Sequence, residues 1–372
     1  MNTPPHVRVL HVLEATAGGT ARHVTELLLG LGADIRPHLV YSPYRSPRFE
    51  QNLSHLRAAG VPCTVVPMRR SVGAHDLLAT WHLRRLLRRH RPDLIHLHSS
   101  KAGGIGRLAA RGTGVPVLYT PHGWSFLGGG RRGRLTLSLE RSLARHTTHL
   151  AAVSESEAHA ATEQVGLAPA NVSVVTNSVP VRPQRPQASP GPLRLGFLGR
   201  LAPQKNPLAA VRVAEALHAS GCSFHLELVG GGPLARATRR AIGHLGLSAR
   251  IDAPGEIVDT EGFYGRIDAL LSTATYEGMP YAILDAMAWG LPTVAFAAPG
   301  VVDVVRHEQT GLLAPMGDVD ALAAQARRLV REPGLADRLG RAARDVIARD
   351  HDPKHQIAAF ETLYRQLASV RT

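Results

Sequence analysis

T-Y-E-G-M-P-Y-A-I-L-D-A-M-A-W-G-L-P, residues Thr275–Pro292, lies between two short apolar segments, Leu270–Thr273 and Thr293–Phe296. The stretch begins as a loop that carries glycine and proline, continues with helix-forming residues, and is stopped by Gly290 and Pro292. A strand, a loop, a helix and a second strand in this order predict one repeat of a parallel α/β sheet.

The same stretch carries two carboxylates. Glu277 lies in the loop, and Asp285 follows eight residues later on the predicted helix. Pro280 suits the first helical position, where its missing N–H has no acceptor to lose. The preceding loop amides are therefore available to a polar or anionic ligand, and the carboxylates can accept hydrogen bonds from hydroxyl groups. A sugar linked to a nucleotide offers both kinds of group.

Short apolar segments alternate with helical patterns along the whole chain. The predicted helices include Thr20–Leu31, His75–His90 and Ser154–Val165. The predicted strands are Val7–Leu13, His38–Tyr41, Cys63–Val66, Leu94–Leu97, Val115–Tyr119, His149–Val153, Val172–Val175, Leu193–Leu198, Phe224–Val229, Leu270–Thr273, Thr293–Phe296 and Gly311–Ala314. Such alternation predicts parallel sheets with helices on both faces.

A proline-rich stretch interrupts this alternation. Residues 183–192 read P-Q-R-P-Q-A-S-P-G-P, and proline at this density excludes regular structure, which predicts a linker. It separates a first domain, residues 1–182, from a second, residues 193–353. At 372 residues the chain is long enough for two separate cores.

The composition is that of a globular protein without membrane-spanning segments. Hydrophobic residues make up 44% of the chain, and the sequence shows neither a membrane-spanning run nor a secretory leader, which predicts a cytoplasmic protein. Two cysteines, Cys63 and Cys222, imply no disulfide framework. Residues 1–182 carry 22 Lys and Arg against 10 Asp and Glu, whereas residues 183–372 carry 21 against 19. The basic first half suits an anionic partner.

Two cations open the second domain. Arg200 and Lys205 flank a loop after the strand Leu193–Leu198, and Asn206 and Pro207 read as a helix N-cap and first helical residue. Arginine can bind phosphate oxygens through two N–H groups and lysine acts as a point charge, so this loop suits a diphosphate.

These residues resemble the motifs of GT4-family retaining glycosyltransferases, of the type found in bacterial polysaccharide biosynthesis. The family pattern, close to S-x-x-E-G-x-x-x-x-x-L-E-A-M-A-x-G-x-P, is matched from Glu277 to Pro292, except that Asp285 stands where the family usually has Glu. The serine of the pattern has its counterpart in Ser272, which lies five residues before Glu277 and not three. The resemblance implies a GT-B fold, in which two Rossmann-like doubly wound α/β domains face each other across a cleft. It also implies that the last helix, within residues 354–372, packs back on the first domain.

The resemblance assigns roles on the donor side. Arg200 and Lys205 would bind the diphosphate and stabilise the departing charge, so that neither a metal nor another cofactor is needed. The residues expected to contact the remainder of the donor are Gly18, Gly19, Gly231, Glu256, Val258, Glu277, Gly278, Met279, Pro280, Leu284 and Asp285. Gly231 belongs to V-G-G-G-P, which is equally consistent with a plain tight turn, and Glu256 and Val258 belong to the segment that meets the nucleobase in this family.

The first domain supplies the remaining candidates. Gly18 and Gly19 precede a helix, but their spacing is not G-x-G-x-x-G, which disfavours a nicotinamide cofactor. His122, in T-P-H-G-W after a strand, is expected at the carboxyl edge of the sheet, where a neutral imidazole can hydrogen-bond a sugar hydroxyl. We predict that it joins Glu277, Arg200 and Lys205 in catalysis. The residues expected to contact the acceptor are Ser99, Ser100, Lys101 and His122.

The helix His75–His90 suggests a membrane surface. Leu77, Leu78 and Trp81 share a sector with four arginines, which is typical of an interfacial anchor on anionic lipid. The alternative is that a neighbouring loop covers Trp81 and water solvates the arginines.

The leading hypothesis is a glycosyltransferase that moves a sugar from a nucleoside-diphosphate sugar to an alcohol acceptor with retention of configuration. We expect the acceptor to be a lipid-linked precursor of surface polysaccharide or glycolipid, reached at the inner face of the cell membrane. The alternatives are a nucleotide-sugar epimerase or hydrolase on the same fold, and a nucleic-acid binder. The last is disfavoured because aromatic residues are only 5% of the chain and no nucleic-acid motif is present.

Overall fold

The protein is described by a computed structural model that covers residues 6–183 and 191–369. The chain divides into two compact units. Unit 1 comprises Met1–Asn177 together with Lys354–Thr372, and unit 2 comprises Ser178–Pro353. The boundary between the units thus falls a few residues before the predicted 182. The predicted linker 183–192 lies for the most part outside the described residues.

Unit 1 is built on a seven-stranded parallel sheet of order β3-β2-β1-β4-β5-β6-β7. Its strands are β1 Val7–Leu13, β2 Ile35–Tyr41, β3 Cys63–Val65, β4 Leu94–His98, β5 Val117–Thr120, β6 His149–Ala152 and β7 Val172–Val174. Its helices are α1 Gly18–Gly30, α2 Phe49–Ala58, α3 His75–His90, α4 Ser100–Ala110, α5 Gly130–Ala144, α6 Glu155–Ala160 and α13 Pro353–Ser369, with short helical turns η1 Ser125–Gly128, η2 Ala161–Val165 and η3 Pro169–Asn171.

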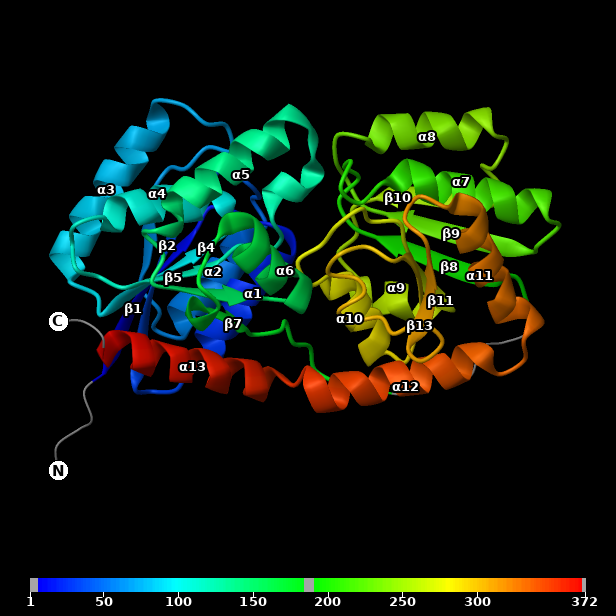
Figure 1. The fold of residues 1–372 in the computed structure, drawn as a ribbon. Coiled ribbons are helices and arrows are strands. Elements are labelled where there is room, and N and C mark those ends of the chain that lie inside the picture. Colours follow the sequence, from blue (N-terminus) through cyan, green and yellow to red (C-terminus); the bar gives the residue numbers. More distant parts are fainter. Residues whose placement is uncertain (1–5, 184–190, 370–372) are drawn as a thin grey trace. The chain divides into compact units, whose positions relative to one another are not determined.

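Both faces of this sheet are buried, because side chains alternate along each strand. Leu10 and Val12 of β1 pack with α3 and α4, whereas Val9 packs on the other face with Leu27 of α1 and Phe360 of α13. Figure 1 shows α13, in red, running along unit 1 beside the blue and green elements of the sheet.

The last helix is part of the unit 1 core. Phe360 and Tyr364 of α13 are fully buried, and the Tyr364 hydroxyl lies 2.8 Å from Nδ1 of His96 on β4. At the edge of this contact the Arg365 guanidinium donates to the Asp34 carboxylate at 2.7 Å. The structure therefore places residues 354–369 in the first unit.

A buried ion pair lies on the α4 side of the sheet. The Arg107 guanidinium donates to the Glu140 carboxylate at 2.6 Å, and the Tyr119 hydroxyl donates to the same carboxylate at 3.2 Å. The Arg107 guanidinium also stacks 4.4 Å from the centre of the Tyr119 ring. Removing Arg107 or Glu140 would leave an unpaired charge in the core, and with Tyr119 the pair forms one polar connection between α4, α5 and β5.

Unit 2 is built on a six-stranded parallel sheet of order β10-β9-β8-β11-β12-β13. Its strands are β8 Leu193–Leu198, β9 Phe224–Val229, β10 Ile251–Gly255, β11 Ala269–Ser272, β12 Thr293–Phe296 and β13 Gly311–Ala314. Its helices are α7 Pro207–Ala219, α8 Ala235–His244, α9 Thr260–Arg266, α10 Tyr281–Ala288, α11 Val319–Arg331 and α12 Leu335–Asp350.

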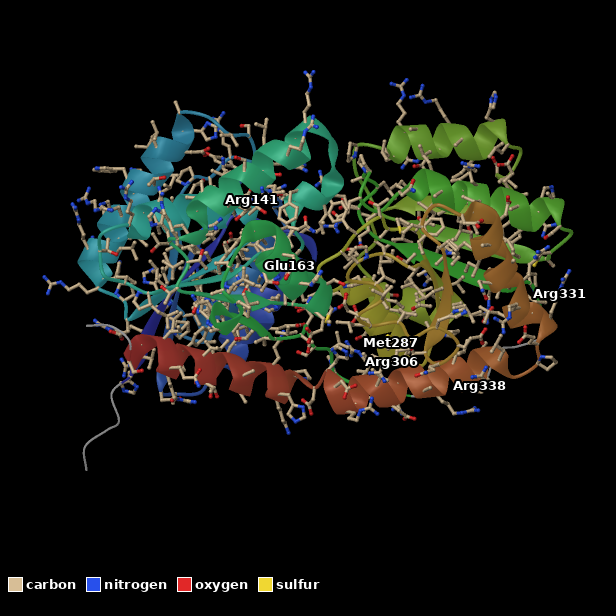
Figure 2. All side chains as sticks on the ribbon, viewed as in Figure 1. Arg141, Glu163, Met287, Arg306, Arg331 and Arg338 are labelled. Atoms are coloured by element: carbon tan, nitrogen blue, oxygen red, sulfur yellow. The ribbon has the colours of Figure 1, made fainter. Side chains whose placement is uncertain are left out.

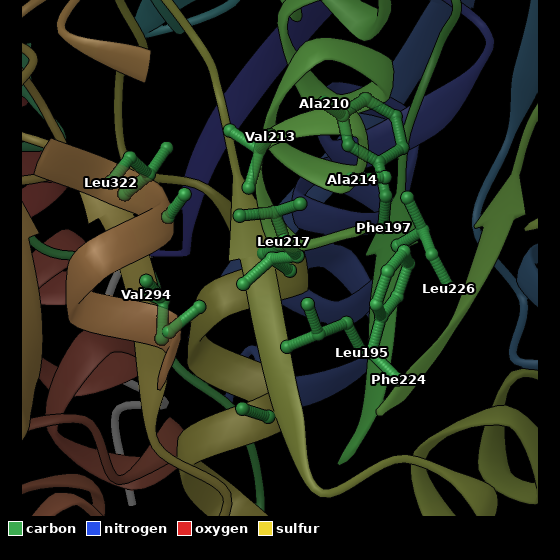
Figure 3. Packing of buried hydrophobic residues seen from close by; sticks show 14 of the residues in the cluster. Leu195, Phe197, Ala210, Val213, Ala214, Leu217, Phe224, Leu226, Val294 and Leu322 are labelled. Atoms are coloured by element: carbon green, nitrogen blue, oxygen red, sulfur yellow. The ribbon is translucent and has the colours of Figure 1, made fainter. Parts of the chain in front are cut away.

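The core of unit 2 forms between the sheet and α7. Figure 3 shows Leu195 and Phe197 of β8 and Phe224 of β9 packed against Ala214 and Leu217 of α7. Figure 2 shows the side chains of the whole chain, in which Arg331 of α11 and Arg338 of α12 lie on the outside of unit 2. Met287 of α10 lies in its interior. Small residues on α7 let the helix approach the strands closely.

Apart from shifts of a few residues at the ends of some elements, such as β2 and β5, two elements differ from the sequence-based expectation. Strand β10 was not predicted, because Asp252 and Pro254 break its apolar pattern; both side chains are exposed at this edge of the sheet. The predicted helix Ser154–Val165 is α6 followed by a π-helical turn, η2. No helix in the described part of the chain is long and apolar enough to cross a membrane.

Candidate functional site

Each unit gathers its candidate residues where the order of its strands reverses. In unit 2 the strands β8 and β11 are neighbours, with Arg200 and Lys205 following β8 and Glu277 following β11. In unit 1 the strands β1 and β4 are neighbours, with Gly18 following β1 and Ser99 following β4. Open parallel sheets bind ligands outside the carboxyl ends of strands at such reversal points.

Hydrogen bonds join the two loops of unit 2. The Thr275 amide donates to the Gln204 carbonyl at 2.8 Å, and the Thr273 hydroxyl donates to the Asn206 carbonyl at 2.9 Å. Asn206 precedes α7, as predicted, but its side chain makes no capping hydrogen bond. Its backbone is left-handed, with φ of 49°, and its carbonyl holds the loop instead. The cation-bearing loop is thereby fixed against the carboxylate-bearing loop.

Lys205 and Glu277 form an ion pair between these loops. Lys205 Nζ lies 2.5 Å from Glu277 Oε1, and the two side chains are 21% and 9% exposed. The Glu277 amide donates to the Pro299 carbonyl at 2.9 Å, and the side-chain amide of Gln204 donates to the Tyr276 carbonyl at 3.1 Å. The structure thus brings together two residues that the sequence assigned to different parts of the ligand.

Arg200 presents its guanidinium to solvent. The residue is exposed, and within residues 6–183 and 191–369 its side chain has no hydrogen-bond or ion-pair partner. An arginine at a strand end with free donors can bind a phosphate through two N–H groups.

Helix α10 carries the second carboxylate. It begins at Tyr281, so Pro280 is its N-cap and not its first helical residue, which corrects the sequence prediction by one position. Leu284 is fully buried and Met279 is 6% exposed, so both support the loop from the core side. Asp285, one helical turn along, is half-buried.

The glycines of V-G-G-G-P have a structural role. A Cβ on Gly230 would overlap the Gly199 carbonyl oxygen, and a Cβ on Gly232 would lie 2.6 Å from the Leu201 carbonyl oxygen. Glycine here lets the turn after β9 pack on the Arg200 loop. Gly231 lies beside the Glu256 side chain, and Val258, further along, is 86% exposed.

In unit 1 the glycine loop opens α1 directly. The helix begins at Gly18, two residues before the predicted Thr20, and Gly18 has φ of 65°. Gly18 and Gly19 are both exposed. Just before them Glu14, 1% exposed, accepts two hydrogen bonds from Arg45 at 2.7 and 2.9 Å. This pair anchors the end of β1 and leaves the amino end of α1 open.

His122 belongs to a cluster of histidines that sequence reasoning did not predict. Its Nε2 lies 3.2 Å from His98 Nδ1, and His98 Nε2 lies 3.2 Å from His11 Nδ1. His23 of α1 packs edge-on to His122 with ring centres 4.5 Å apart, and its Nδ1 lies 3.0 Å from Asn177 Oδ1. The only sequence signal was the alternation of His96 and His98 on a buried strand.

The cluster keeps its rings neutral. Burial, followed by the charges of His23 and His38, lowers the pKa of His11 to about 3, and burial lowers the pKa of His23 to about 4. Burial and then the charge of His23 hold the pKa of His122 well below its ordinary value. A neutral His122 can donate or accept a hydrogen bond near pH 7 but carries no charge. Its backbone has φ of 58°, which the loop must hold in place.

The three candidates at the start of α4 are placed differently from one another. Lys101 Nζ donates to Asp76 Oδ2 at 2.6 Å and to the Ser71 carbonyl at 2.7 Å, which ties it to the start of α3. The Ser100 hydroxyl donates to Ser125 Oγ at 3.3 Å. Ser99 has φ of 79° and a buried hydroxyl. Lys101 would have to leave its ion pair to meet an acceptor.

Sequence reasoning also missed Glu157, which positions His122. Its carboxylate accepts from the Gly123 amide at 2.6 Å and from the Val153 amide at 2.7 Å, and its carbonyl accepts from the Trp124 ring at 2.9 Å. The signal was present as Ser154 followed three residues later by Glu157, a capping-box spacing at the start of α6.

Two family models match the chain, a glycosyl transferase 4-like domain over residues 18–178 and glycosyl transferases group 1 over residues 182–346. The chain is 30% identical over 264 residues to the UDP-Gal:alpha-D-GlcNAc-diphosphoundecaprenol alpha-1,3-galactosyltransferase of Escherichia coli, covering 66% of this chain and 68% of that protein. It is 28% identical over 300 residues to the 2-deoxystreptamine glucosyltransferase of Streptomyces kanamyceticus, covering 73% and 76%.

The fold is similar to that of Anabaena HepE, solved in complex with UDP and glucose. The TM-score is 0.80 at 20% identity, over 97% of this chain and 100% of that one. This likeness confirms the predicted GT-B architecture of two parallel α/β sheets.

Proposed function

We infer that this chain, which belongs to the GT4-type glycosyltransferases with a GT-B fold, transfers a sugar from a nucleoside-diphosphate sugar to an alcohol with retention of anomeric configuration. The observation that carries the proposal is the pairing of Lys205 with Glu277 across two joined loops at the β8–β11 reversal. A cation for the diphosphate and a carboxylate for the sugar hydroxyls are held side by side.

Four charged residues bind different parts of the donor. Arg200 and Lys205 bind the diphosphate, and Glu277 accepts hydrogen bonds from hydroxyls of the transferred sugar. Asp285 binds the ribose, and the shorter reach of its side chain relative to glutamate suits a contact away from the reacting centre. Binding of the diphosphate draws Lys205 toward the phosphates and frees Glu277 to orient the sugar.

The chemical step is a substitution on one face of the sugar. The bond from the anomeric carbon to the phosphate oxygen breaks, the bond to the acceptor oxygen forms on the same face, and the departing phosphate oxygen takes the acceptor proton. Arg200 and Lys205 stabilise the negative charge that develops on the leaving group, so this step proceeds without a bound metal ion. Neutral His122 donates a hydrogen bond to the sugar or the acceptor.

The acceptor we propose is lipid-linked and is reached at the inner face of the cell membrane. The Escherichia coli relative is named for a diphosphoundecaprenol substrate, which supports a lipid-linked acceptor. Ser99, Ser100 and Lys101, at the start of α4, are the residues proposed to contact it.

The surface of unit 1 supports contact with anionic lipid. Leu77 and Trp81 of α3 are 74% and 54% exposed, so no loop among the described residues covers Trp81, and Leu135 of α5 is 72% exposed. Buried residues of α3 and partly buried residues of α5 pack into one core, so the opposite sides of both helices face outward from the same side of the sheet. Arg85, Arg88 and Arg89 are exposed beside Trp81, whereas Arg84 is occupied by the Ala109 and Arg111 carbonyls.

The test is a donor screen followed by turnover. The donor is identified as the UDP-, GDP- or ADP-sugar that raises the melting temperature, since a ligand of the folded state must stabilise it. Lys205→Ala and Glu277→Ala are each expected to lower the rate of transfer more than 100-fold, which is about the loss expected when a transition-state contact is removed. The far-ultraviolet circular dichroism spectrum of each variant should be unchanged. Rapid conversion of donor without acceptor would instead identify an epimerase or hydrolase.

A further inference from the structure

The histidine cluster of unit 1 contains a set of nitrogens that matches a transition-metal site. His23, His98 and His122 each offer one ring nitrogen within 4.8 Å of the others. His98 Nδ1 and His122 Nε2 are 3.2 Å apart. Ligand atoms about 2.0–2.1 Å from a tetrahedral zinc ion lie about 3.3 Å from one another, so this pair is already at ligand spacing.

Hydrogen bonds outside the triad set the tautomers that a metal needs. His23 Nδ1 donates to Asn177 Oδ1 at 3.0 Å, which leaves the lone pair on Nε2. That Nε2 is buried, and no side chain or backbone group in the described part of the chain bonds it. His98 can donate from Nε2 to His11 Nδ1 at 3.2 Å, which leaves its Nδ1 as a ligand. Metal-binding histidines are oriented by such contacts through their second nitrogen.

A second triad in the cluster is less suited to a metal. His11, His96 and His98 also lie within ligand spacing, but His96 uses both ring nitrogens. Its Nδ1 is bonded to Tyr364 and its Nε2 lies 2.9 Å from the Thr120 hydroxyl. A metal there would have to break one of these buried hydrogen bonds.

We propose that His23, His98 and His122 form a binding site for a zinc-type transition metal ion, and that occupation of this site inhibits sugar transfer. The ion takes the lone pair of His122 Nε2 and thereby restricts the ring that the reaction uses. Its fourth position stays open to water or to an oxygen of a ligand, as in three-histidine zinc sites. The inhibition rests on the proposed function, whereas the binding does not.

Cobalt(II) titration of the metal-free full chain tests the binding. We expect one Co²⁺ per chain with the strong visible absorption of tetrahedral cobalt, no thiolate charge-transfer band, and displacement by Zn²⁺. His23→Gln removes one ligand and is expected to abolish this spectrum, whereas the matched variant His38→Gln, in the same unit but outside the triad, retains it. Circular dichroism and melting temperature establish that both variants fold.

Two results would overturn the site. One is wild-type protein that gives only the weak spectrum of six-coordinate cobalt, and the other is a folded His23→Gln variant that binds like wild type. Inhibition is measured separately, as the rate of sugar transfer with and without Zn²⁺. We expect Zn²⁺ to reduce the rate of the wild-type protein at least tenfold and the rate of the His23→Gln variant less than twofold. Equal inhibition of both proteins would refute the regulatory role, while absence of transfer in metal-free wild type would refute the proposed function and leave the binding result intact.

Discussion

The ammonium group of Lys205 and the carboxylate of Glu277 neutralise each other at 2.5 Å, so the cation proposed for the diphosphate is engaged before any donor arrives. Binding of a diphosphate therefore competes with an internal ion pair. Because of this competition, replacing Lys205 and replacing Glu277 should change nucleoside-diphosphate affinity in different ways, although both residues are proposed to serve one reaction.

Replacing Glu277 by Gln should release Lys205. We expect Glu277→Gln to bind the nucleoside diphosphate at least as tightly as wild type while transfer falls more than 100-fold, because the internal competitor is removed along with the contact to the sugar. Lys205→Ala should weaken nucleoside-diphosphate binding about tenfold, the equivalent of about 1.4 kcal/mol. Isothermal titration calorimetry measures both affinities, with the exposed Arg212→Ala on α7 as control. Weaker binding by Glu277→Gln would contradict the competition.

Replacing Gly230 by Ala should disrupt the Arg200 loop. A Cβ there overlaps the Gly199 carbonyl, and the φ of 144° is a region that only glycine adopts readily, so we expect a loss on the order of 3 kcal/mol in unfolding free energy. Gly243→Ala in α8 is the matched control, because its Cβ meets nothing within 4 Å and should stabilise the helix by about 0.5–1 kcal/mol. Urea unfolding measures both changes. Equal stability of the two variants would refute the role given to the close approach.

Removing the Tyr364 hydroxyl should loosen α13. Tyr364→Phe leaves His96 Nδ1 buried without its partner, and we expect unfolding free energy to fall by about 1–3 kcal/mol. The exposed Tyr44→Phe, with 55% of its surface accessible, should change stability by less than about 0.5 kcal/mol. Thermal unfolding of both variants at one pH distinguishes the two outcomes, and a Tyr364→Phe protein as stable as wild type would show that the hydroxyl is dispensable.

Acid should destabilise unit 1 in part through His38. Burial, followed by the charge of His90, lowers the pKa of His38 to about 4, and its Nε2 lies 2.8 Å from the Thr64 hydroxyl. Since the unfolded state has the higher pKa, about 6.5, it binds more protons between pH 4 and pH 6.5, and stability is lost as pH falls through this window. We expect His38→Gln to reduce the loss between pH 7 and pH 5 by about 1 kcal/mol, allowing for the partial exposure of the ring. Urea unfolding at both pH values measures it, and an unchanged loss would contradict the assignment.

Exposed leucines and Trp81 should bind anionic vesicles. We expect wild-type protein to sediment with vesicles of phosphatidylglycerol and phosphatidylcholine but not with phosphatidylcholine alone, because arginines attract the anionic surface and apolar groups insert into it. Trp81→Glu should reduce the bound fraction at least fivefold, while Val330→Glu, at an exposed position of α11 in unit 2, should leave it unchanged. Equal binding by both variants would exclude α3 as the contact.

Local pattern predicted much of the fold. Helix α3 has the predicted bounds His75–His90, and β8 and β9 also match, because apolar periodicity and flanking breakers were unambiguous there. Strand β10 was missed because an edge strand with Asp252 and Pro254 loses the period that identifies strands.

The candidate site was also predicted only where the signal is local in the sequence. Motif residues that follow strands, such as Arg200 and Glu277, were found because their chemistry is local. The Lys205–Glu277 pair and the chain from His11 through His98 to His122 were not, since each joins residues more than 20 positions apart that only the strand order brings together. Arg84 looked like a lipid-facing charge in the helical pattern, but the end of α4 supplies carbonyls that occupy it.

Helix α13 completes a core whose other members, from Val9 to Val175, are synthesised long before it, with the whole of the second unit in between. During translation the second unit can therefore reach its final form first, while the first waits with one side of its sheet uncovered. A nascent chain of this enzyme is expected to be most vulnerable to proteases and to aggregation in that interval, and chaperones that shield apolar strands would act on it then.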